Sequence, residues 1–155
     1  MPFYAKPSGG YTISSTEGTA NIEAAYDYLN SFGYTKGAVA GMFGNASAES
    51  GLNPWRWQSD TVTYSDGYGL FQFTPASDYI NLTGIPDHAP NLSTSSQTSG
   101  ASPDDAKAQL YVFTNDTLVK WYSPLWRTYW RTSLYPALYQ QAQRILNTYG
   151  DGTNL

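Results

Sequence analysis

The chain has 155 residues, of which 41% are hydrophobic, 16% aromatic and 13% charged, and its formal net charge is −4. This length and composition predict one compact domain with a core of its own, and they argue against disorder over most of the chain. A net negative charge is unlike the basic surface of nucleic-acid-binding proteins, so we expect no nucleic acid as a partner.

The residue types present exclude several kinds of site. The chain contains no cysteine, which excludes disulfides, thiol catalysis and cysteine zinc sites. Its single histidine, His88, cannot form a multi-histidine metal centre, and its Pro-rich surroundings predict a solvated loop residue. We therefore expect neither a metal nor a cofactor. No apolar run is long enough to cross a membrane, and the opening MPFYAKPSGG lacks the apolar segment of a signal peptide.

The first part of the chain predicts an arm followed by two helices. Residues 1–18 are rich in Gly, Pro, Ser and Thr and are predicted to form an N-terminal arm or linker before a domain of residues 19–150. Residues 21–32 have apolar side chains at helical spacing, and Gly33 is a natural stop. A second helix is expected to begin near Thr35. Its apolar stripe consists of Val39, Met42, Phe43 and Ala46.

Three glycines, Gly37, Gly41 and Gly44, fall on the opposite face of this second helix. Because glycine weakens an isolated helix, they indicate that a neighbouring backbone approaches closely and that the helix is covered on both sides. Two turns after Met42, Glu49 returns to the apolar stripe, just before SGLNP ends the helix. The pattern therefore places a carboxyl group at the rim of the predicted core.

After this helix the period of the sequence changes. Residues 61–64 and 68–73 are predicted to form a small hairpin joined by an SDG turn. TPASDYINL then predicts a short helix. Residues 86–101 read as a loop, which is either a flap over the site or a plain surface loop.

The last part of the chain predicts two further helices. SPDDAKAQLYVF begins one of them, with Ser102 as its cap and Asp105 at the capping-box position. Its predicted inward face consists of Leu110, Phe113, Leu118, Trp121 and Tyr122. A final helix is expected over residues 134–149, and residues 151–155 form a frayed C-terminus or the start of a linker. The predicted fold class is α+β, predominantly helical, with a small β-hairpin or three-stranded sheet after the helix that carries Glu49.

Glu49 is the first candidate for chemistry. A carboxyl group that is partly removed from water keeps its proton more readily near neutral pH, and it can then protonate a leaving oxygen. Glycoside hydrolysis requires such a general acid. The alternative is a structural glutamate that pairs with Arg56 or Lys36 at the helix end. The spacing alone does not separate these two interpretations.

The usual glycosidase mechanisms also require a second carboxylate. Asp60 and Asp66 flank the predicted hairpin and are the candidates, although aspartate is also common in turns for backbone reasons. Trp55 and Trp57 alternate along an extended segment, and either ring is suited to stacking on a sugar or to packing. We expect one of them to be packed and the other exposed.

Gln72 is a candidate sugar ligand, because its side-chain amide can bind an acetamido or hydroxyl group. In a strand, alternation places Gln72 and Leu70 on one face, opposite Phe71 and Phe73. That face would be the floor of a groove. A solvent-facing glutamine is the alternative.

Two segments, GNASAESGLNP and DGYGLFQFTPAS, together resemble the phage tail lysozyme family, whose members degrade bacterial cell walls at the tips of phage tails. A Glu-Ser pair after a helix, followed by Gly-Leu-x-Gln, is also similar to goose-type lysozymes and soluble lytic transglycosylases. The resemblance covers about residues 21–86. It implies a lysozyme-like fold and cleavage of the β-1,4 bond between N-acetylmuramic acid and N-acetylglucosamine in peptidoglycan.

The resemblance also implies roles for individual residues. Glu49 matches the catalytic glutamate and takes the role of general acid, and Ser50 matches the serine beside it in the groove. Phe73 stands where family members usually carry tryptophan. The residues that match the strand lining the sugar groove are Tyr68, Gly69, Leu70, Phe71 and Gln72. Neither Asp60 nor Asp66 is assigned by the resemblance, which leaves hydrolysis and transglycosylation open.

The expected partners are then peptidoglycan glycan strands and other phage tail proteins, and the expected location is the tail of the virion. A tail component needs no signal peptide, because the virion carries it to the wall. An acidic chain gains no long-range attraction to an anionic wall, so binding must come from a specific groove. Three functions remain open: a muramidase, a lytic transglycosylase that uses the same glutamate, and a non-catalytic wall-binding or structural tail module.

Overall fold

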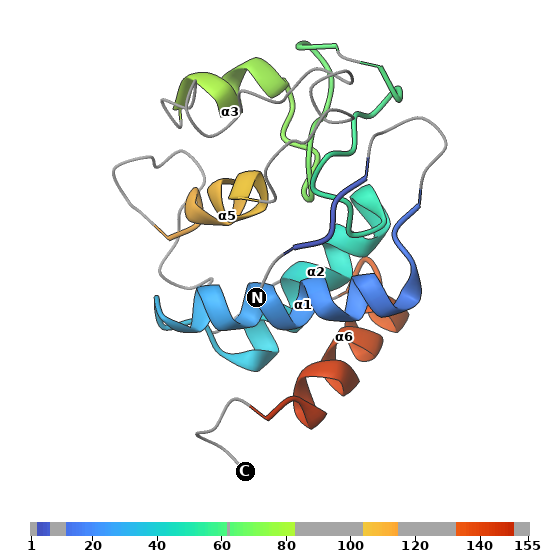
Figure 1. The fold of residues 1–155 in the computed structure, drawn as a ribbon, viewed down its shortest axis with the longest axis vertical. Helices are drawn as coiled ribbons and strands as arrows, with labels where there is room; N and C mark the ends of the chain where they lie inside the picture. The colour runs from blue at the N-terminus through green and yellow to red at the C-terminus, as the bar shows by residue number, and fades with distance from the viewer. Residues whose placement is uncertain (1–2, 7–11, 62, 83–103, 115–132, 151–155) are drawn as a thin grey trace.

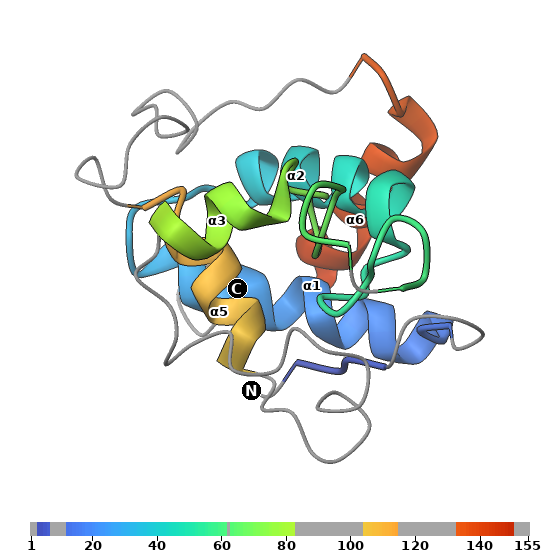
Figure 2. The same ribbon diagram turned by 90° about the horizontal axis from the view of Figure 1, so that it is seen from above.

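The computed structural model describes residues 3–6, 12–61, 63–82, 104–114 and 133–150. Its helices are α1 (Ser15–Asn30), α2 (Lys36–Ser50), α3 (Ala76–Leu82), α5 (Asp104–Tyr111) and α6 (Pro136–Thr148). In Figure 1, α1 crosses in front of α2, with α6 below them and α3 and α5 above. Figure 2 shows the same helices from above. The described part of the chain is mostly helical, as predicted, and none of its helices is both long and apolar enough to span a membrane.

Helix α1 begins at Ser15, ahead of the predicted start at Asn21. Its first turn is fixed by a reciprocal capping box. The Glu17 backbone N–H donates to Ser14 Oγ at 3.1 Å, and the Ser14 backbone N–H donates to Glu17 Oε1 at 2.9 Å. The capping-box spacing is visible in the sequence, but it lies within residues 1–18, which had been interpreted as an arm.

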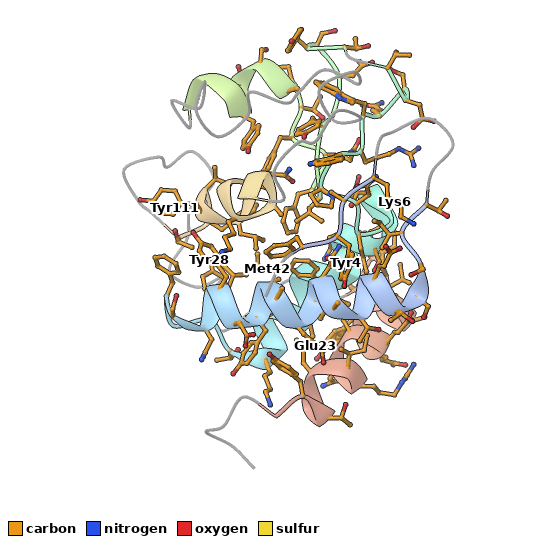
Figure 3. All side chains as sticks on the ribbon, in the orientation of Figure 1. Tyr4, Lys6, Glu23, Tyr28, Met42 and Tyr111 are labelled. Carbon is orange, nitrogen blue, oxygen red and sulfur yellow. The ribbon has the colours of Figure 1, made fainter. Side chains whose placement is uncertain are left out.

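Helix α2 begins and ends where the sequence predicts. The Thr35 side chain caps its N-terminus by accepting a hydrogen bond from the Ala38 backbone N–H, and Gly51 ends it in the left-handed conformation with φ 62°. Met42, at the centre of Figure 3, belongs to a stripe that is fully buried. The members of this stripe are Val39, Met42, Phe43 and Ala46, which confirms the predicted face.

The glycine face of α2 is confirmed at Gly44 and wrong at Gly37. A Cβ at Gly44 would lie 2.9 Å from both the backbone nitrogen and the Cα of Tyr139 in α6, so the two helices meet backbone to backbone. Gly37 is exposed, and the nearest atom to a Cβ built there is Thr35 Oγ1 at 4.0 Å. It lies in the first turn of the helix.

The C-terminal end of α6 is bound to both of the first two helices. The Lys36 ammonium group donates to the Tyr149 carbonyl oxygen at 3.1 Å, and the Tyr149 hydroxyl donates to Asp27 Oδ2 at 2.6 Å. The Tyr149 ring also packs edge-on against Tyr26, with 6.4 Å between the centroids. Helix α6 therefore closes the bundle of α1 and α2.

The predicted hairpin is not confirmed. Within the described residues of this region, only two isolated antiparallel bridges occur, Trp57–Tyr68 and Tyr68–Phe73. Positive φ angles at Gly69 (88°) and Gln72 (53°) fold the chain back on itself. Tyr68 and Phe73 then pair with each other, with N···O distances of 3.1 and 2.9 Å. A tight turn over residues 68–73 replaces the predicted returning strand.

The helix predicted from TPASDYINL is confirmed as α3. Helix α5 ends at Tyr111 and is followed by a hydrogen-bonded turn, so the prediction that it continues through Phe113 is wrong. Leu110 and Phe113 are both buried, as predicted for the inward face. Several predictions fall outside the described residues: His88, the loop of residues 86–101, Ser102, Leu118, Trp121, Tyr122 and residues 151–155.

Residues 3–6, which we call the N-terminal strap, lie on the helical body. Phe3 is buried. The backbone N–H and C=O of Tyr4 both bond to the Asn21 side chain, at 2.7 and 2.9 Å. Those of Lys6 bond in the same way to the Asn53 side chain, at 3.1 and 2.8 Å (Figure 3). This part of the predicted arm is therefore packed, whereas the division of the chain into arm, domain and C-terminal end stays a prediction.

Candidate active site

A cavity of about 280 Å³ lies beside the C-terminal end of α2. It is lined by Glu49, Arg56, Gln58, Gln72 and Thr74. Glu49 and Gln72 come from the two separate segments that the sequence analysis selected, and the fold brings them to one cavity. Arg56 was considered only as an ion-pair partner, and Gln58 and Thr74 were not identified at all.

Glu49 lies in the last turn of α2, and its side chain is exposed. The partial burial expected from the helical wheel is therefore wrong. The two cations proposed as structural partners are engaged elsewhere, since Arg56 pairs with Asp60 and Lys36 bonds to Tyr149. Among the residues that the structure describes, Glu49 forms no ion pair. Its carboxyl group is thus open to the cavity.

Ser50, the neighbour of Glu49, is buried rather than exposed in a groove. Its hydroxyl group donates to the Ala46 carbonyl oxygen at 2.9 Å, one turn earlier in α2. Gly51 then ends the helix. The predicted groove contact of Ser50 is therefore not observed, and its hydroxyl instead bonds to the helix backbone beneath the site.

Arg56 and Asp60 form an ion pair at the cavity. Arg56 Nε lies 3.2 Å from Asp60 Oδ1, and the two side chains are 41% and 45% exposed. Arg56 Nε also donates to the Trp57 carbonyl oxygen at 3.1 Å. Asp60 is not one of the residues that line the cavity, so it is placed as a partner of Arg56 rather than as a second reacting carboxylate.

Asp66 has the alternative role that the sequence analysis left open, that of a turn former. Its backbone N–H donates to the Thr63 carbonyl oxygen at 3.0 Å, and its own carbonyl oxygen accepts from the Ala76 N–H at 2.9 Å. It does not line the cavity that contains Glu49. The structure thus gives no support to Asp66 as the second carboxylate.

Both tryptophans are buried, with Trp55 6% and Trp57 0% exposed. The expectation that one of them is exposed for sugar stacking is wrong. Trp57 packs against the Tyr68 ring at 4.5 Å and the Tyr64 ring at 6.0 Å between centroids. The chain folds back over these rings because the Gln58 N–H donates to the Gly67 carbonyl oxygen at 3.0 Å.

Most of the segment expected to line the sugar groove belongs to the core. Its buried members are Tyr68, Gly69, Leu70 and Phe73. Phe71 is half-buried and meets Phe43 and Phe113 edge-on, with centroid distances of 5.9 and 5.0 Å. These residues support the site from beneath, because the tight turn directs their rings inward.

Gln72 lies at the cavity while Leu70 is in the core, so the predicted sharing of a face by these two residues is wrong. Gln72 Nε2 donates to the carbonyl oxygens of Arg56 and Gly69, at 3.1 and 2.9 Å. Its amide donors are therefore used within the protein. Gly67 leaves room for this arrangement, since a Cβ there would lie 2.9 Å from Gln72 Oε1. Gln72 holds the tight turn against the segment that carries Arg56.

Gln109 of α5 is an important residue that the sequence analysis missed. Its side chain is fully buried. Gln109 Oε1 accepts from the Leu70 N–H at 2.7 Å, and its Nε2 donates to the Pro54 carbonyl oxygen at 2.7 Å. It thereby joins the segment after Glu49 to the turn that carries Gln72. Nothing in the local pattern of AKAQLY distinguishes this glutamine from a surface residue.

Backbone strain occurs at the cavity and next to it, and also at Leu52, which lines a separate cavity beside α1 and α6. Within the described ranges, the non-glycine residues with positive φ are Leu52 (65°), Asp60 (60°) and Gln72 (53°). Leu52 follows the helix that carries Glu49, Asp60 pairs with Arg56, and Gln72 lines the cavity. Such conformations cost on the order of 1–3 kcal/mol each and occur preferentially at functional sites. The positions of Asp60 and Gln72 support this cavity as the functional site.

Comparisons with known proteins show the family of the chain. The sequence profile described as phage tail lysozyme matches residues 20–144, which confirms the resemblance and extends it well beyond the two motifs. Morphogenesis protein 1 of Bacillus phage B103 is 42% identical over 80 residues, which are 51% of this chain and 21% of that protein. The match thus spans about a fifth of that relative's length. Because the family profile covers more than half of the sequence, the chain belongs to the phage tail lysozyme family.

Proposed function

We propose that the chain is a muramidase that cleaves the β-1,4 bond between N-acetylmuramic acid and N-acetylglucosamine in peptidoglycan. The observation that carries the proposal is the position of Glu49, whose carboxyl group forms no ion pair within the described residues and lines the same cavity as Gln72 of the second motif. Family membership supports a lysozyme-type glycosidase and peptidoglycan as the substrate.

In this mechanism Glu49 is the general acid. It gives its proton to the glycosidic oxygen as the bond from that oxygen to the anomeric carbon breaks. The cavity is open to solvent, which suits a long polymer strand. A strand bound across the cavity would displace water from the carboxyl group and strengthen its interaction with the reacting oxygen.

A lytic transglycosylase is the second candidate. It is favoured by the fact that, among the described residues that line the cavity, Glu49 is the one carboxylate. In that reaction Glu49 acts first as acid and then as base, and the C6 hydroxyl of the muramyl residue attacks its own anomeric carbon. The product is a 1,6-anhydro sugar, and no water is consumed.

Mass analysis of the soluble products from purified Gram-positive peptidoglycan tests both reactions. The proteins compared are the wild type, Glu49→Gln and Glu23→Gln, a matched control because Glu23 lies in α1 and not at the cavity. We expect muropeptides from the wild type and from Glu23→Gln, and none from Glu49→Gln. Hydrolysis and transglycosylation products differ in mass by one water. Full activity in Glu49→Gln would remove the assigned role.

If neither the wild type nor the variants release products, the third interpretation applies, and the domain is a wall-binding or structural module. Sedimentation of the protein with intact peptidoglycan would then detect binding without turnover. If instead the wild type releases products and Glu49→Gln does not, the same measurement on the variant separates loss of binding from loss of chemistry.

We also propose that the protein acts from the phage tail on the host cell wall, together with other tail proteins. This rests on the family and on the relative described as a morphogenesis protein. Immunogold labelling of intact virions is expected to mark the tail. Label found only on free protein in the lysate would contradict this placement.

A further inference from the structure

Arg56 is the one cation among the described residues that line the cavity with Glu49. Its guanidinium group is held along one edge, since Nε donates to the Trp57 carbonyl oxygen at 3.1 Å and lies 3.2 Å from Asp60 Oδ1 in an ion pair. Within the described part of the chain, no hydrogen bond from either Nη group is observed. The end of the guanidinium that carries the two Nη groups is therefore available to a ligand.

The partners of Arg56 fix its direction. Asp60 adopts a left-handed backbone conformation, with φ 60°, at the position from which its carboxylate reaches Arg56 Nε. The Arg56 carbonyl oxygen in turn accepts hydrogen bonds from the Gly69 N–H at 2.8 Å and from Gln72 Nε2 at 3.1 Å. Both the side chain and the backbone of Arg56 are thus held, although the side chain remains 41% exposed.

The two Nη groups of an arginine form a planar fork that matches a carboxylate in a bidentate geometry. In a glycan made of alternating glucosamine and muramic acid residues, only the muramic acid carries a lactyl group. That group ends in a free carboxylate or continues into a peptide that carries carboxylates of its own. A cation beside the general acid can therefore distinguish the two sugars, which are otherwise alike.

We infer that Arg56 binds a carboxylate on the substituent of the muramyl residue and thereby determines which sugar lies beside Glu49. Asp60 is a positioning residue that orients Arg56 through Nε. This inference rests on the proposed function, since it concerns the same cavity and the same substrate class. In this inference Asp60 positions Arg56 and does not act as the second reacting carboxylate.

Calorimetry on the Glu49→Gln background tests the inference without turnover. The ligands are a glucosamine–muramic acid tetrasaccharide with free lactyl groups, the same saccharide with its stem peptides, and neutral chitotetraose. We expect the background protein to bind one of the muramyl ligands in preference to chitotetraose. Adding Arg56→Gln is expected to weaken that binding about tenfold or more, because it removes a charge-assisted contact, and to leave chitotetraose binding unchanged.

Two further variants separate recognition from a merely structural role. Arg56→Lys keeps the positive charge but loses the planar pair of Nη donors. We therefore expect it to retain only part of the preference for muramyl ligands over chitotetraose. Asp60→Asn is expected to weaken muramyl binding and not chitotetraose binding, whereas damage to the fold would weaken both. A thermal midpoint measured for each variant shows whether it is folded.

The two muramyl ligands identify the source of the carboxylate. If Arg56→Gln weakens binding of the peptide-free saccharide, the carboxylate belongs to the lactyl group. If it weakens binding of the peptide-bearing saccharide alone, the carboxylate belongs to the stem peptide. Three results would overturn the inference: no binding of either muramyl ligand by the background protein, equal affinity for muramyl and neutral ligands, or a preference that survives Arg56→Gln. Failure of the proposed function is seen separately, as a wild-type protein that releases no soluble products from peptidoglycan.

Discussion

Gln109 and Leu70 are joined inside the core, where the Leu70 backbone N–H donates to Gln109 Oε1 at 2.7 Å. The same side chain reaches the Pro54 carbonyl oxygen through Nε2, also at 2.7 Å. The shape of the cavity therefore depends on α5, a helix that contributes none of the residues lining it. The buried Gln109 side chain therefore links the segment that follows Glu49 to the turn that carries Gln72.

Replacing Gln109 with leucine is expected to destabilise the fold. Two buried backbone groups, the Leu70 N–H and the Pro54 carbonyl, would each lose a partner at a cost of about 1–3 kcal/mol. Denaturant unfolding measures the effect. Gln140→Leu, on the exposed face of α6, is the matched control and should change the free energy of unfolding by about 0.5 kcal/mol or less. Equal effects of the two substitutions would show that the Gln109 bonds contribute nothing.

Gly69→Ala is expected to be much more damaging than Gly51→Ala. Both glycines have positive φ, 88° and 62°, so alanine at either position costs on the order of 1 kcal/mol of backbone strain. At Gly51 a Cβ meets nothing within 4 Å, whereas at Gly69 it overlaps the Gln109 amide. Thermal unfolding of the two variants should therefore differ clearly. If Gly51→Ala proved equally destabilising, the overlap with Gln109 would not be the cause.

Gly44→Ala and Gly37→Ala are expected to change stability in opposite directions. At Gly44 a Cβ lies 2.9 Å from the Tyr139 backbone, so α2 and α6 must separate at a cost of about 1–3 kcal/mol. At the exposed Gly37 alanine should raise the free energy of unfolding by about 0.5–1 kcal/mol, because alanine favours the helix. Denaturant titration of both variants measures the two signs. A gain in stability at Gly44 would contradict the backbone contact between these helices.

The lowered pKa of the Glu17 carboxyl group predicts that the stability of the fold depends on pH. The Ser14 backbone N–H, and then the Lys6 ammonium group, hold the pKa of the Glu17 carboxyl below its ordinary value of 4.5. Because the folded state lowers this pKa, its contribution to stability is present above pH 4.5 and is lost as the pH falls through the lower, folded value. Glu17→Gln should therefore lose less stability than the wild type over that acidic range.

Unfolding measured at neutral pH and well below pH 4.5 tests this prediction. Glu23→Gln in the same helix is the control and should follow the wild type. If Glu17→Gln and the wild type lost the same stability in acid, the capping box would not be responsible for it.

The parts of the fold that the sequence predicts well depend on neighbouring residues. Helix α2 is the clearest case, because the Thr35 cap, the apolar stripe and the Gly51 stop all lie within the helix or next to it. The sequence analysis likewise selected Glu49 and Gln72 from the two segments as candidate site residues. The family match over residues 20–144 confirmed the family that these two segments had indicated.

The predictions that were wrong concern parts of the fold that depend on contacts between residues far apart in the sequence. The letters YGLFQF are typical of a strand, but Gln72 adopts a left-handed conformation and its amide bonds to Arg56, 16 positions earlier. Gln109 reaches Leu70 across 39 positions, which no local pattern reveals. A helical wheel likewise predicted partial burial of Glu49, whereas among the described residues its side chain is exposed.

The contacts of Tyr149 have a consequence for how the protein is made. Its hydroxyl bonds to Asp27, 122 positions earlier, and its carbonyl oxygen bonds to Lys36, 113 positions earlier. A ribosome adding about 5–20 residues per second needs on the order of ten seconds to pass from α2 to α6. During that interval the glycine face of α2 has no neighbour, and contacts this far apart in the chain slow folding. We expect the nascent chain to complete its fold only after α6 has emerged, so that the proposed muramidase activity begins when synthesis of this domain is nearly complete.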